Sequence, residues 1–380
     1  MSHPQGIPLL VPQLPERLAL QPFLDRIDLS RHYSNFGPLV QELEQRLATD
    51  YSTHASLPLE VVTVSSATAG LELALSSLEL PPGSRVLVPA LTFVATLTAI
   101  LRAGHLPVIC DIDPDNWLLT PDIADECMRE SDCQAVIAVA TFGQAQDTRA
   151  WSAWQQRHGV RVIIDAAAAY GSQWVEAVDI PVVFSMHATK SLAAGEGGFV
   201  VTGQPGQRRM IKELSNFGIN LSPDTDHPVG HLSYAGTNAK LSEYHAAVGL
   251  ASLNSWQAQA DLRHAVFLQY RQTLQQTCGD ALIWQQGPAP AAPTTFSVRL
   301  GSSGRRSKLE QLCAVSRIST RRWYQPLLHQ HAAKVGPIVH LPTPTAEAVS
   351  ADLIGLPFFP MLTRGQMAEV SQHVAMAVTA

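Results

Sequence analysis

The sequence predicts an α/β protein in which a mostly parallel sheet lies between helices, with a smaller α+β domain at the C-terminal end. Between about residues 60 and 205, short β-branched runs alternate with helical stretches. The runs are mostly apolar and do not alternate regularly between apolar and polar residues. Strands of this kind are typical of a parallel sheet covered by helices on both faces.

The expected elements follow from this alternation. Residues 206–260 look helical and connecting, with a polar interruption at 221–236, and the remainder has a strand and helices of its own. We expect a large domain over residues 1–260 and a small domain over 261–380. The expected strands of the large domain are 61–64, 85–88, 107–110, 135–139, 161–164, 181–184 and 198–201, and its helices include 69–78, 93–103 and 147–158.

The amino-acid composition limits which classes of protein the chain can belong to. Hydrophobic residues make up 46% and charged residues 15% of the 380 residues, which indicates a globular chain. A net charge of −6 argues against nucleic acid as a partner. The five cysteines are scattered without a C-x-x-C, which favours reduced thiols in a cytoplasm. We find no cleavable signal and no apolar segment long enough to span a membrane, so no membrane association is expected.

Lys190 has the most informative setting in the chain. It follows the apolar run 182–184 and precedes a glycine-rich turn at 195–198. Small residues around it leave room for a flat ligand. Burial disfavours the ammonium form, so that a neutral amine can attack a carbonyl carbon. A solvated surface lysine is the commoner situation for this residue type, and Lys190 alone does not exclude it.

Asp165 supplies the second signal, at the end of the apolar run 162–164. Such an aspartate either caps a turn or holds a pyridine nitrogen protonated, so that the ring accepts electrons. A lysine that forms a Schiff base, together with an acidic partner for a pyridinium nitrogen, is what pyridoxal 5′-phosphate (PLP) chemistry requires. The two residues together favour a PLP site.

Further candidates lie at the same edge of the predicted sheet. The turn Ser66-Ala67-Thr68 opens a helix, where free N–H groups and a hydroxyl suit a phosphate, although a plain helix cap is commoner. Phe93 opens the next helix and is either a core aromatic or a stacking surface for a ring. Thr68, Phe93, Asp165 and Ser185 all fall at or just after strand ends, where such sheets bind ligands, so we expect one site.

A series of motifs, in order over roughly residues 33–362, resembles the DegT/StrS-type sugar aminotransferases, which are fold-type I PLP enzymes. Taken together, these motifs are highly specific. The matching segments are 35–40, 66–69, 88–96, 107–113, 185–190, 195–198, 238–250, 319–327 and 356–357.

The resemblance implies a role for each cofactor-binding residue. Lys190 would form the Schiff base with PLP and then move the proton between the Cα and C4′ carbons. Asp165 would pair with the pyridinium nitrogen and Phe93 would stack on the ring. The phosphate would be held by Thr68, the amide of Ala69 and Ser185, with Asn238 reaching the phosphate of the neighbouring subunit.

The resemblance therefore implies a homodimer with composite active sites. Lys240 stands where arginine is common in the family, and Tyr324 matches a family tyrosine in the small domain; both are candidates for substrate contact. A lysine meets a phosphate as a point charge, without the bidentate geometry of arginine.

One departure concerns the cofactor directly. Ala168 stands where the family usually has a glutamine that bonds the ring hydroxyl of PLP. One hydrogen bond contributes about 0.5–1.5 kcal/mol net. We therefore expect a changed rate or affinity, with cofactor binding retained.

The activity implied by the resemblance is transfer of an amino group from L-glutamate to a nucleotide-linked keto-deoxysugar, with the cofactor alternating between PLP and pyridoxamine 5′-phosphate. The motif at 165–171 and the segment 236–245 most resemble members that act at C4. This favours dTDP-4-keto-6-deoxy-D-glucose as the acceptor, giving a 4-amino sugar for surface-polysaccharide or O-antigen assembly. A 3-keto sugar or a UDP-linked sugar remains an alternative.

Other functions fit less well. A sugar dehydratase of the same fold has histidine in place of Lys190. A non-catalytic regulatory relative would have no need of Lys190, Asp165 and Thr68 together. No histidine, cysteine or carboxylate group shows metal-ligand spacing and no G-x-S-x-G is present, so we expect neither a metal centre nor a triad hydrolase.

Overall fold

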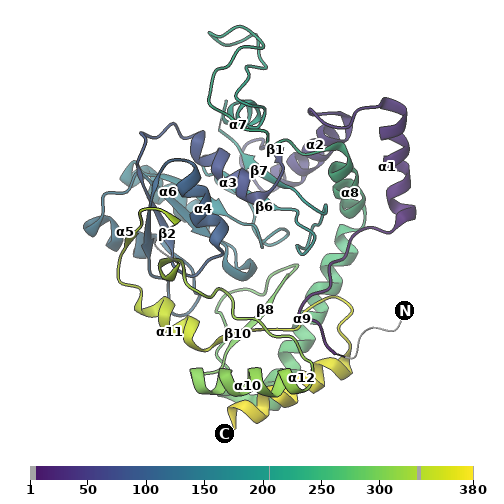
Figure 1. Cartoon of the computed structure of the whole chain (residues 1–380), viewed down its shortest axis with the longest axis vertical. Coiled ribbons are helices and arrows are strands. Elements are labelled where there is room, and N and C mark those ends of the chain that lie inside the picture. Colours follow the sequence, from purple (N-terminus) through teal and green to yellow (C-terminus); the bar gives the residue numbers. More distant parts are fainter. Residues whose placement is uncertain (1–5, 205, 332–334, 380) are drawn as a thin grey trace.

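The computed structural model describes residues 6–204, 206–331 and 335–379 (Figure 1). A large sheet of eight strands has the order β1-β7-β6-β5-β4-β2-β3-β9. Only β7 runs against the others, because it pairs antiparallel with both β1 and β6 while the remaining neighbours are parallel. The strands are β1 (Glu60–Val64), β2 (Arg85–Pro89), β3 (Leu106–Cys110), β4 (Ala135–Val139), β5 (Arg161–Asp165), β6 (Val182–Ser185), β7 (Gly198–Thr202) and β9 (Val339–His340).

The predicted fold class is confirmed, and each of the seven expected strands forms. The eighth strand, β9, was not expected, because two residues give no readable pattern. The helices before residue 256 are α1 (Arg17–Ser30), α2 (Pro38–Ser52), α3 (Ala67–Ser76), α4 (Val94–Arg102), α5 (Pro121–Glu130), α6 (Thr148–His158), α7 (Gln207–Ser215) and α8 (Glu243–Asn254), with the 3-10 turn η1 (Thr141–Gly143).

The long helix α9 (Trp256–Cys278) runs from α8 to a second, two-stranded sheet (Figure 1). The domain boundary predicted at residue 260 falls inside this helix, and the division remains a proposal. After α9, strand β9 pairs with β3 of the large sheet, and helix α11 packs in the core beside that sheet. The remaining elements are β8 (Phe296–Arg299), β10 (Leu353–Leu356), α10 (Ser303–Val315), α11 (Pro344–Asp352), α12 (Arg364–Val378) and the turns η2 (Gly279–Ala281) and η3 (Leu328–Gln330).

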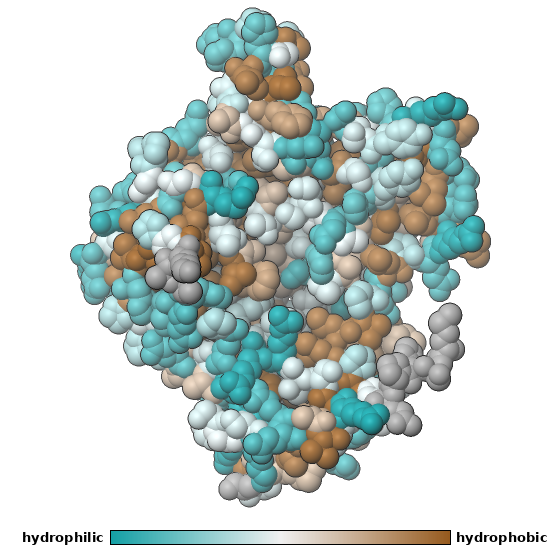
Figure 2. Space-filling view, viewed as in Figure 1, coloured by the Kyte–Doolittle hydropathy of each residue, from teal (hydrophilic) through white to brown (hydrophobic). Residues whose placement is uncertain are grey.

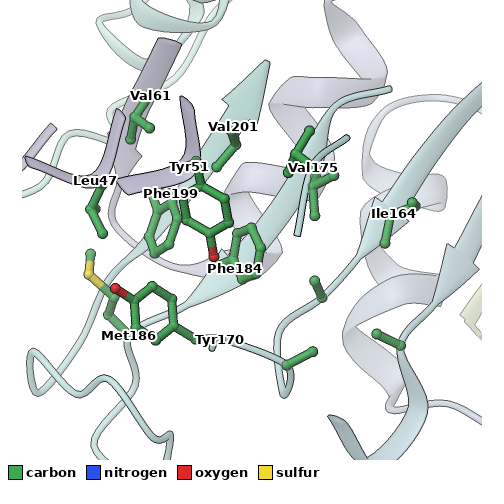
Figure 3. Packing of buried hydrophobic residues seen from close by; sticks show 14 of the residues in the cluster. Leu47, Tyr51, Val61, Ile164, Tyr170, Val175, Phe184, Met186, Phe199 and Val201 are labelled. Carbon is green, nitrogen blue, oxygen red and sulfur yellow. The ribbon is translucent and has the colours of Figure 1, made fainter. Parts of the chain in front are cut away.

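Neighbouring residues of each central strand pack into opposite layers. Val162 and Ile164 belong to a core with helices α1, α2, α5, α6 and α8, while Ile163 belongs to a second core with α3, α4, α7 and α11. This is the burial on both faces that the continuous apolar runs predict. In the first core, Tyr51 of α2 packs against Phe184 and Phe199, whose rings stack 4.9 Å apart (Figure 3).

Short polar side chains define where helices begin. The Ser66 hydroxyl accepts from the amide of Ala69 at the start of α3, and Asp147 accepts from two amides at the start of α6. Ser242 caps α8 in the same manner. These caps satisfy N–H groups that the helix leaves unpaired. Among the described residues, no helix is long and apolar enough to cross a bilayer.

Two glycines allow α3 to lie directly on the sheet. A Cβ on Gly70 would come within 2.8 Å of Val183 Cγ1, and a Cβ on Gly198 would come within 2.6 Å of the amide nitrogen of Ala67. The first turn of α3 therefore rests on strands β6 and β7. This contact fixes the position of the 66–69 turn relative to the end of β6.

We predict that Gly70→Ala destabilises the protein, because its methyl group would overlap Val183 in a packed core. Overpacking costs typically about 1–3 kcal/mol, and the better helix propensity of alanine offsets only part of it. The measurement is the free energy of unfolding in urea. Gly304→Ala in α10 is the matched control, since the nearest atom to its Cβ is 3.9 Å away. Equal stability of the two variants would contradict the prediction.

Candidate active site

Several of the predicted site residues lie where β5, β6 and β1 end. Asp165 is the last residue of β5 and Ser185 is the last residue of β6. Gly198 of β7 pairs with Ser185 on one side and with Val64 of β1 on the other. Strand β7 thus brings the turn after β1 next to the end of β6. The co-location expected from strand ends is present in the fold.

Lys190 lies in a tight loop between β6 and β7. The amide of Lys190 donates to the carbonyl of His187, and the amide of Ala188 donates to the carbonyl of Gly195. Gly195 and Gly197 have φ values of 86° and 140°, which side chains rarely adopt. The glycine-rich turn therefore returns the chain to β7 and holds the lysine backbone against the sheet end.

Asp165 is buried and held in one orientation by two hydrogen bonds. The Thr96 hydroxyl donates to Oδ2 at 2.8 Å, and the amide of Ala167 donates to Oδ1 at 3.1 Å. Burial raises the pKa of Asp165, while these two donors and the charge of Lys190 oppose that rise. The donors stabilise the ionised carboxylate, which is the form that can pair with a cation.

Packed protein around the Lys190 amine lowers its pKa by desolvation, and the carboxylate of Asp165 opposes this effect. The residue nevertheless keeps part of its surface open. A neutral amine is thus favoured at a position that a ligand can reach. This is the environment that a carbonyl-attacking lysine needs.

Only some of the hydrogen-bond donors proposed to hold a phosphate are available for it. Thr68 is half-buried, and no hydrogen bond of its hydroxyl is found within the described part of the chain. The Ser185 hydroxyl accepts from the amide of His187 at 3.2 Å, which leaves its proton for another acceptor. The amide of Ala69 already donates to Ser66 Oγ at 3.1 Å. Thr68 and Ser185 are therefore better placed as donors than the Ala69 amide.

Three aromatic rings lie in contact beside the carboxylate. Phe93 immediately precedes α4 and is 51% exposed, which is more than a core residue would be. Its ring centroid lies 6.1 Å from that of Tyr324, and Tyr324 stacks on Phe142 at 5.3 Å with an interplanar angle of 7°. Burial, followed by the charge of Asp165, raises the pKa of the Tyr324 phenol. Tyr324 therefore reaches the site from the C-terminal part of the chain.

Asn238 and Lys240 lie in a different setting. The Lys240 amine donates to Asn238 Oδ1 at 2.7 Å and lies 4.5 Å from the centre of the Phe217 ring. Asn238 is exposed, although the adjacent carbonyl of Ala239 accepts from the amide of Ser65. Within one chain neither side chain has a contact with Lys190 or Asp165 among the described groups.

Sequence reasoning missed Thr96 and Phe142. The motif 88–96 contains Thr96, yet its sequence position alone gives it no role. A threonine in the first helical turn after a strand is a weak indication of a donor, because its direction depends on the packing of α4. Phe142 has a φ of 59° in the turn after β4, and nothing in its sequence neighbours predicts its stacking on Tyr324.

Two motif positions have structural roles. The carboxylate of Glu243 accepts from the amides of Leu39 and Val40, both at 2.9 Å, and so caps α2. A Cβ on Gly37 would come within 2.7 Å of Glu243 Cδ, so the glycine makes room for that carboxylate. Tyr170, which follows Ala168 by two residues, belongs to the first core (Figure 3). Its ring packs edge-on against that of Trp256, with the ring centroids 4.5 Å apart.

We predict that the apoprotein of Lys190→Met is more stable than the wild type at neutral pH. The pKa of Lys190 lies below its usual 10.5 in the folded state, so the unfolded chain binds more protons between these two values. Wild-type stability therefore rises with pH through that window, and the advantage of the methionine should shrink toward pH 10.5. Urea unfolding at several pH values measures this. Lys308→Met is the control, and an advantage of Lys190→Met that does not change with pH would contradict the explanation.

Comparison with known proteins finds the family that the sequence motifs resemble. The sequence model of the DegT/DnrJ/EryC1/StrS aminotransferase family matches residues 20–375. A putative PLP-dependent aminotransferase from Bacillus cereus ATCC 10987 superposes with a TM-score of 0.87 at 25% identity, covering 97% of this chain and 99% of that one.

Two further solved structures are similar over nearly their whole length. DesI, determined in the presence of its TDP-sugar product, has a TM-score of 0.84 at 28% identity, covering 99% of this chain and 94% of that one. DesV from S. venezuelae has a TM-score of 0.82 at 26% identity, covering 97% and 100%. The family match spans nearly the entire described chain. The protein therefore belongs to the DegT/DnrJ/EryC1/StrS aminotransferase family and is a PLP-dependent aminotransferase.

Proposed function

We propose that this aminotransferase transfers an amino group from L-glutamate to a nucleotide-linked keto-deoxysugar, with dTDP-4-keto-6-deoxy-D-glucose as the acceptor we favour. The observation that supports an aminotransferase most strongly is the lysine of lowered pKa, Lys190, beside the buried carboxylate of Asp165. The choice of acceptor is supported by the similarity to DesI, which was determined with its TDP-sugar product. A 3-keto or UDP-linked sugar is the alternative acceptor.

The donor groups present fit PLP. Asp165, whose ionised form is favoured by its two hydrogen bonds, would hold a protonated pyridine nitrogen, and the exposed ring of Phe93 would cover one face of the cofactor. Thr68 and Ser185 have hydroxyl protons free for phosphate oxygens. When bound, PLP supplies an aldehyde for the amine and a ring that accepts electrons from the substrate carbon.

The remaining chemistry belongs to the protein. Lys190 would hold the cofactor through its side-chain amine, and the lowered pKa of that amine suits it to accept and return a proton at the substrate carbon. Tyr324, stacked on Phe142, limits the space beside Asp165. Ala168 has no side-chain donor, so the hydroxyl of the cofactor ring depends on another donor or water.

The exposed loop that contains Asn238 supports a homodimer with composite sites. Residues 219 and 232 pair across a projection that extends from the molecule near α7 (Figure 1). Hydrophobic side chains are exposed along it and near it, and Figure 2 shows brown patches on the projection. A second copy that covers this loop would bring Asn238 and Lys240 toward the neighbouring phosphate site. The exposed hydrophobic residues are Phe217, Leu221, Val229, Leu232 and Tyr244.

The cellular role also rests on the sequence. A cytoplasmic location and a part in polysaccharide or O-antigen biosynthesis remain predictions. All five cysteines are free thiols, as a reducing compartment requires. A purely regulatory role is the alternative class, and replacing Lys190 distinguishes it from catalysis.

We predict that L-glutamate bleaches the visible absorbance of the PLP-loaded protein and that the 4-keto-6-deoxy sugar nucleotide restores it. Bleaching without recovery would support the aminotransferase class but contradict the proposed acceptor, and 3-keto and UDP-linked sugars would then be tested.

We predict that Lys190→Ala lowers turnover by several orders of magnitude, because the variant lacks both the attacking amine and the proton carrier. Unchanged turnover in this variant would overturn the proposed role of Lys190.

We also predict that Thr96→Val weakens PLP binding by about tenfold to a hundredfold, since a hydrogen bond to a charged group contributes about 1.5–3 kcal/mol. Without the hydroxyl, the pKa of Asp165 rises further and the carboxylate pairs less well with a pyridinium nitrogen. Thr96→Ser retains the donor and is the matched control. The measurement is a titration of apoprotein with PLP, and equal affinities of the valine and serine variants would contradict the prediction.

A further inference from the structure

Three potential metal ligands lie together at the edge of the large sheet, apart from the Lys190 site. They are His329 in η3, His340 in β9 and Glu347 in α11. One ligand atom from each lies within 4.8 Å of the other two. The expectation of no metal centre rested on spacing along the sequence, and these residues come from three separate elements that only the fold brings together.

Histidine 329 provides the fixed part of this cluster. Its side chain is only 10% exposed, and its buried Nδ1 has no hydrogen-bond partner among the described groups. Burial lowers its pKa and the neighbouring His340 lowers it further, while the carboxylate of Glu347 opposes this shift. The packing around His329 therefore holds its ring in place beside the two exposed side chains.

The other groups converge on the same point. Glu347 Oε1 lies 3.4 Å from His329 Nε2. The hydroxyl of Thr343 donates to Glu347 Oε1 at 3.3 Å and lies 3.1 Å from His340 Nε2. Two imidazole nitrogens and a carboxylate oxygen thus lie within 4.8 Å of one another, with a hydroxyl beside them.

We propose that His329, His340 and Glu347 bind a divalent transition-metal ion of the Zn²⁺ type. Two imidazoles and one carboxylate form a donor set that suits Zn²⁺, Co²⁺ or Ni²⁺ better than Mg²⁺ or Ca²⁺, and a water completes the coordination. No residue of the Lys190 site belongs to this set, so the proposal does not depend on the aminotransferase function.

Binding requires a small rearrangement of the exposed members. The two rings stack 4.1 Å apart at an interplanar angle of 10°, and parallel rings do not point their lone pairs at one atom. Bonds of about 2.0–2.2 Å bring tetrahedral ligand atoms to about 3.4 Å from one another. His340 and Glu347 are exposed and have room to turn, whereas His329 is held by the packing around it.

The three backbones are well fixed. The amide of Leu328 donates to the carbonyl of Ala90, which places η3 at the end of β2. The carboxylate of Asp111 accepts from the amides of Thr345 and Ala346 at 2.8 and 2.7 Å, which anchors α11. Strand β9 pairs with β3. Only side-chain rotation is therefore needed to form the site.

The test uses PLP-loaded protein that lacks a histidine tag and has been stripped with a chelator. Calorimetric titration with Zn²⁺ should show one ion per chain. His340→Ala and Glu347→Gln should each weaken binding at least about tenfold, because one ligand is lost. Both residues are exposed, so these variants are expected to fold. His32→Ala, which removes an exposed histidine elsewhere, should bind as the wild type does.

Co²⁺ supplies an independent readout of the ligands. Its visible d–d absorbance should appear on binding to the wild type and to His32→Ala, and change in shape or disappear in His340→Ala and Glu347→Gln. Zn²⁺ binding of equal affinity in all four proteins would place the ion elsewhere and overturn the proposal. Absence of Zn²⁺ binding at micromolar concentrations would also overturn it.

Discussion

The reversed strand β7 is the constraint on which the active site depends. It lies between β1 and β6, and its first residue, Gly198, pairs with the last residue of each. Because Gly198 has no side chain, the first turn of α3 can rest on the sheet at this point. The hydroxyls of Thr68 and Ser185 therefore face one region, although they are separated by more than one hundred residues of sequence. The same glycine-rich segment closes the loop that contains Lys190.

Two titratable groups, Lys190 and Asp165, share this region, and burial shifts their pKa values in opposite directions. Desolvation favours the neutral amine at Lys190 and the neutral acid at Asp165. Asp165 accepts hydrogen bonds from the Thr96 hydroxyl and the Ala167 amide, and these two bonds favour its ionised form. The hydrogen bonds thus favour an anion at Asp165, while burial favours a basic amine at Lys190. This difference in hydrogen bonding assigns their roles, as is common in sites that combine proton transfer with charge stabilisation.

Much of the large sheet could be predicted from the sequence because most residues of each long strand are apolar, as in 86–88 and 162–164. The positions of Asp165 and Ser185 at strand ends followed from the same pattern. The direction of β7 could not be predicted, since an apolar run reads the same for either direction. The contacts of Thr96, Phe142 and Tyr324 were also out of reach, because they depend on how α4, η1 and the segment before η3 pack together. The role of Glu243 as a cap was hidden by its distance from α2 in the chain.

The capping of α2 by Glu243 has a consequence for protein synthesis. The carboxylate bonds amides that lie 204 and 203 residues earlier in the chain. A ribosome therefore delivers α2 long before the group that satisfies the start of this helix. Until residue 243 has left the exit tunnel, those two amides must be hydrated or bound by another partner. The first core, which includes α2 and α8, can close only after most of the large sheet has been made.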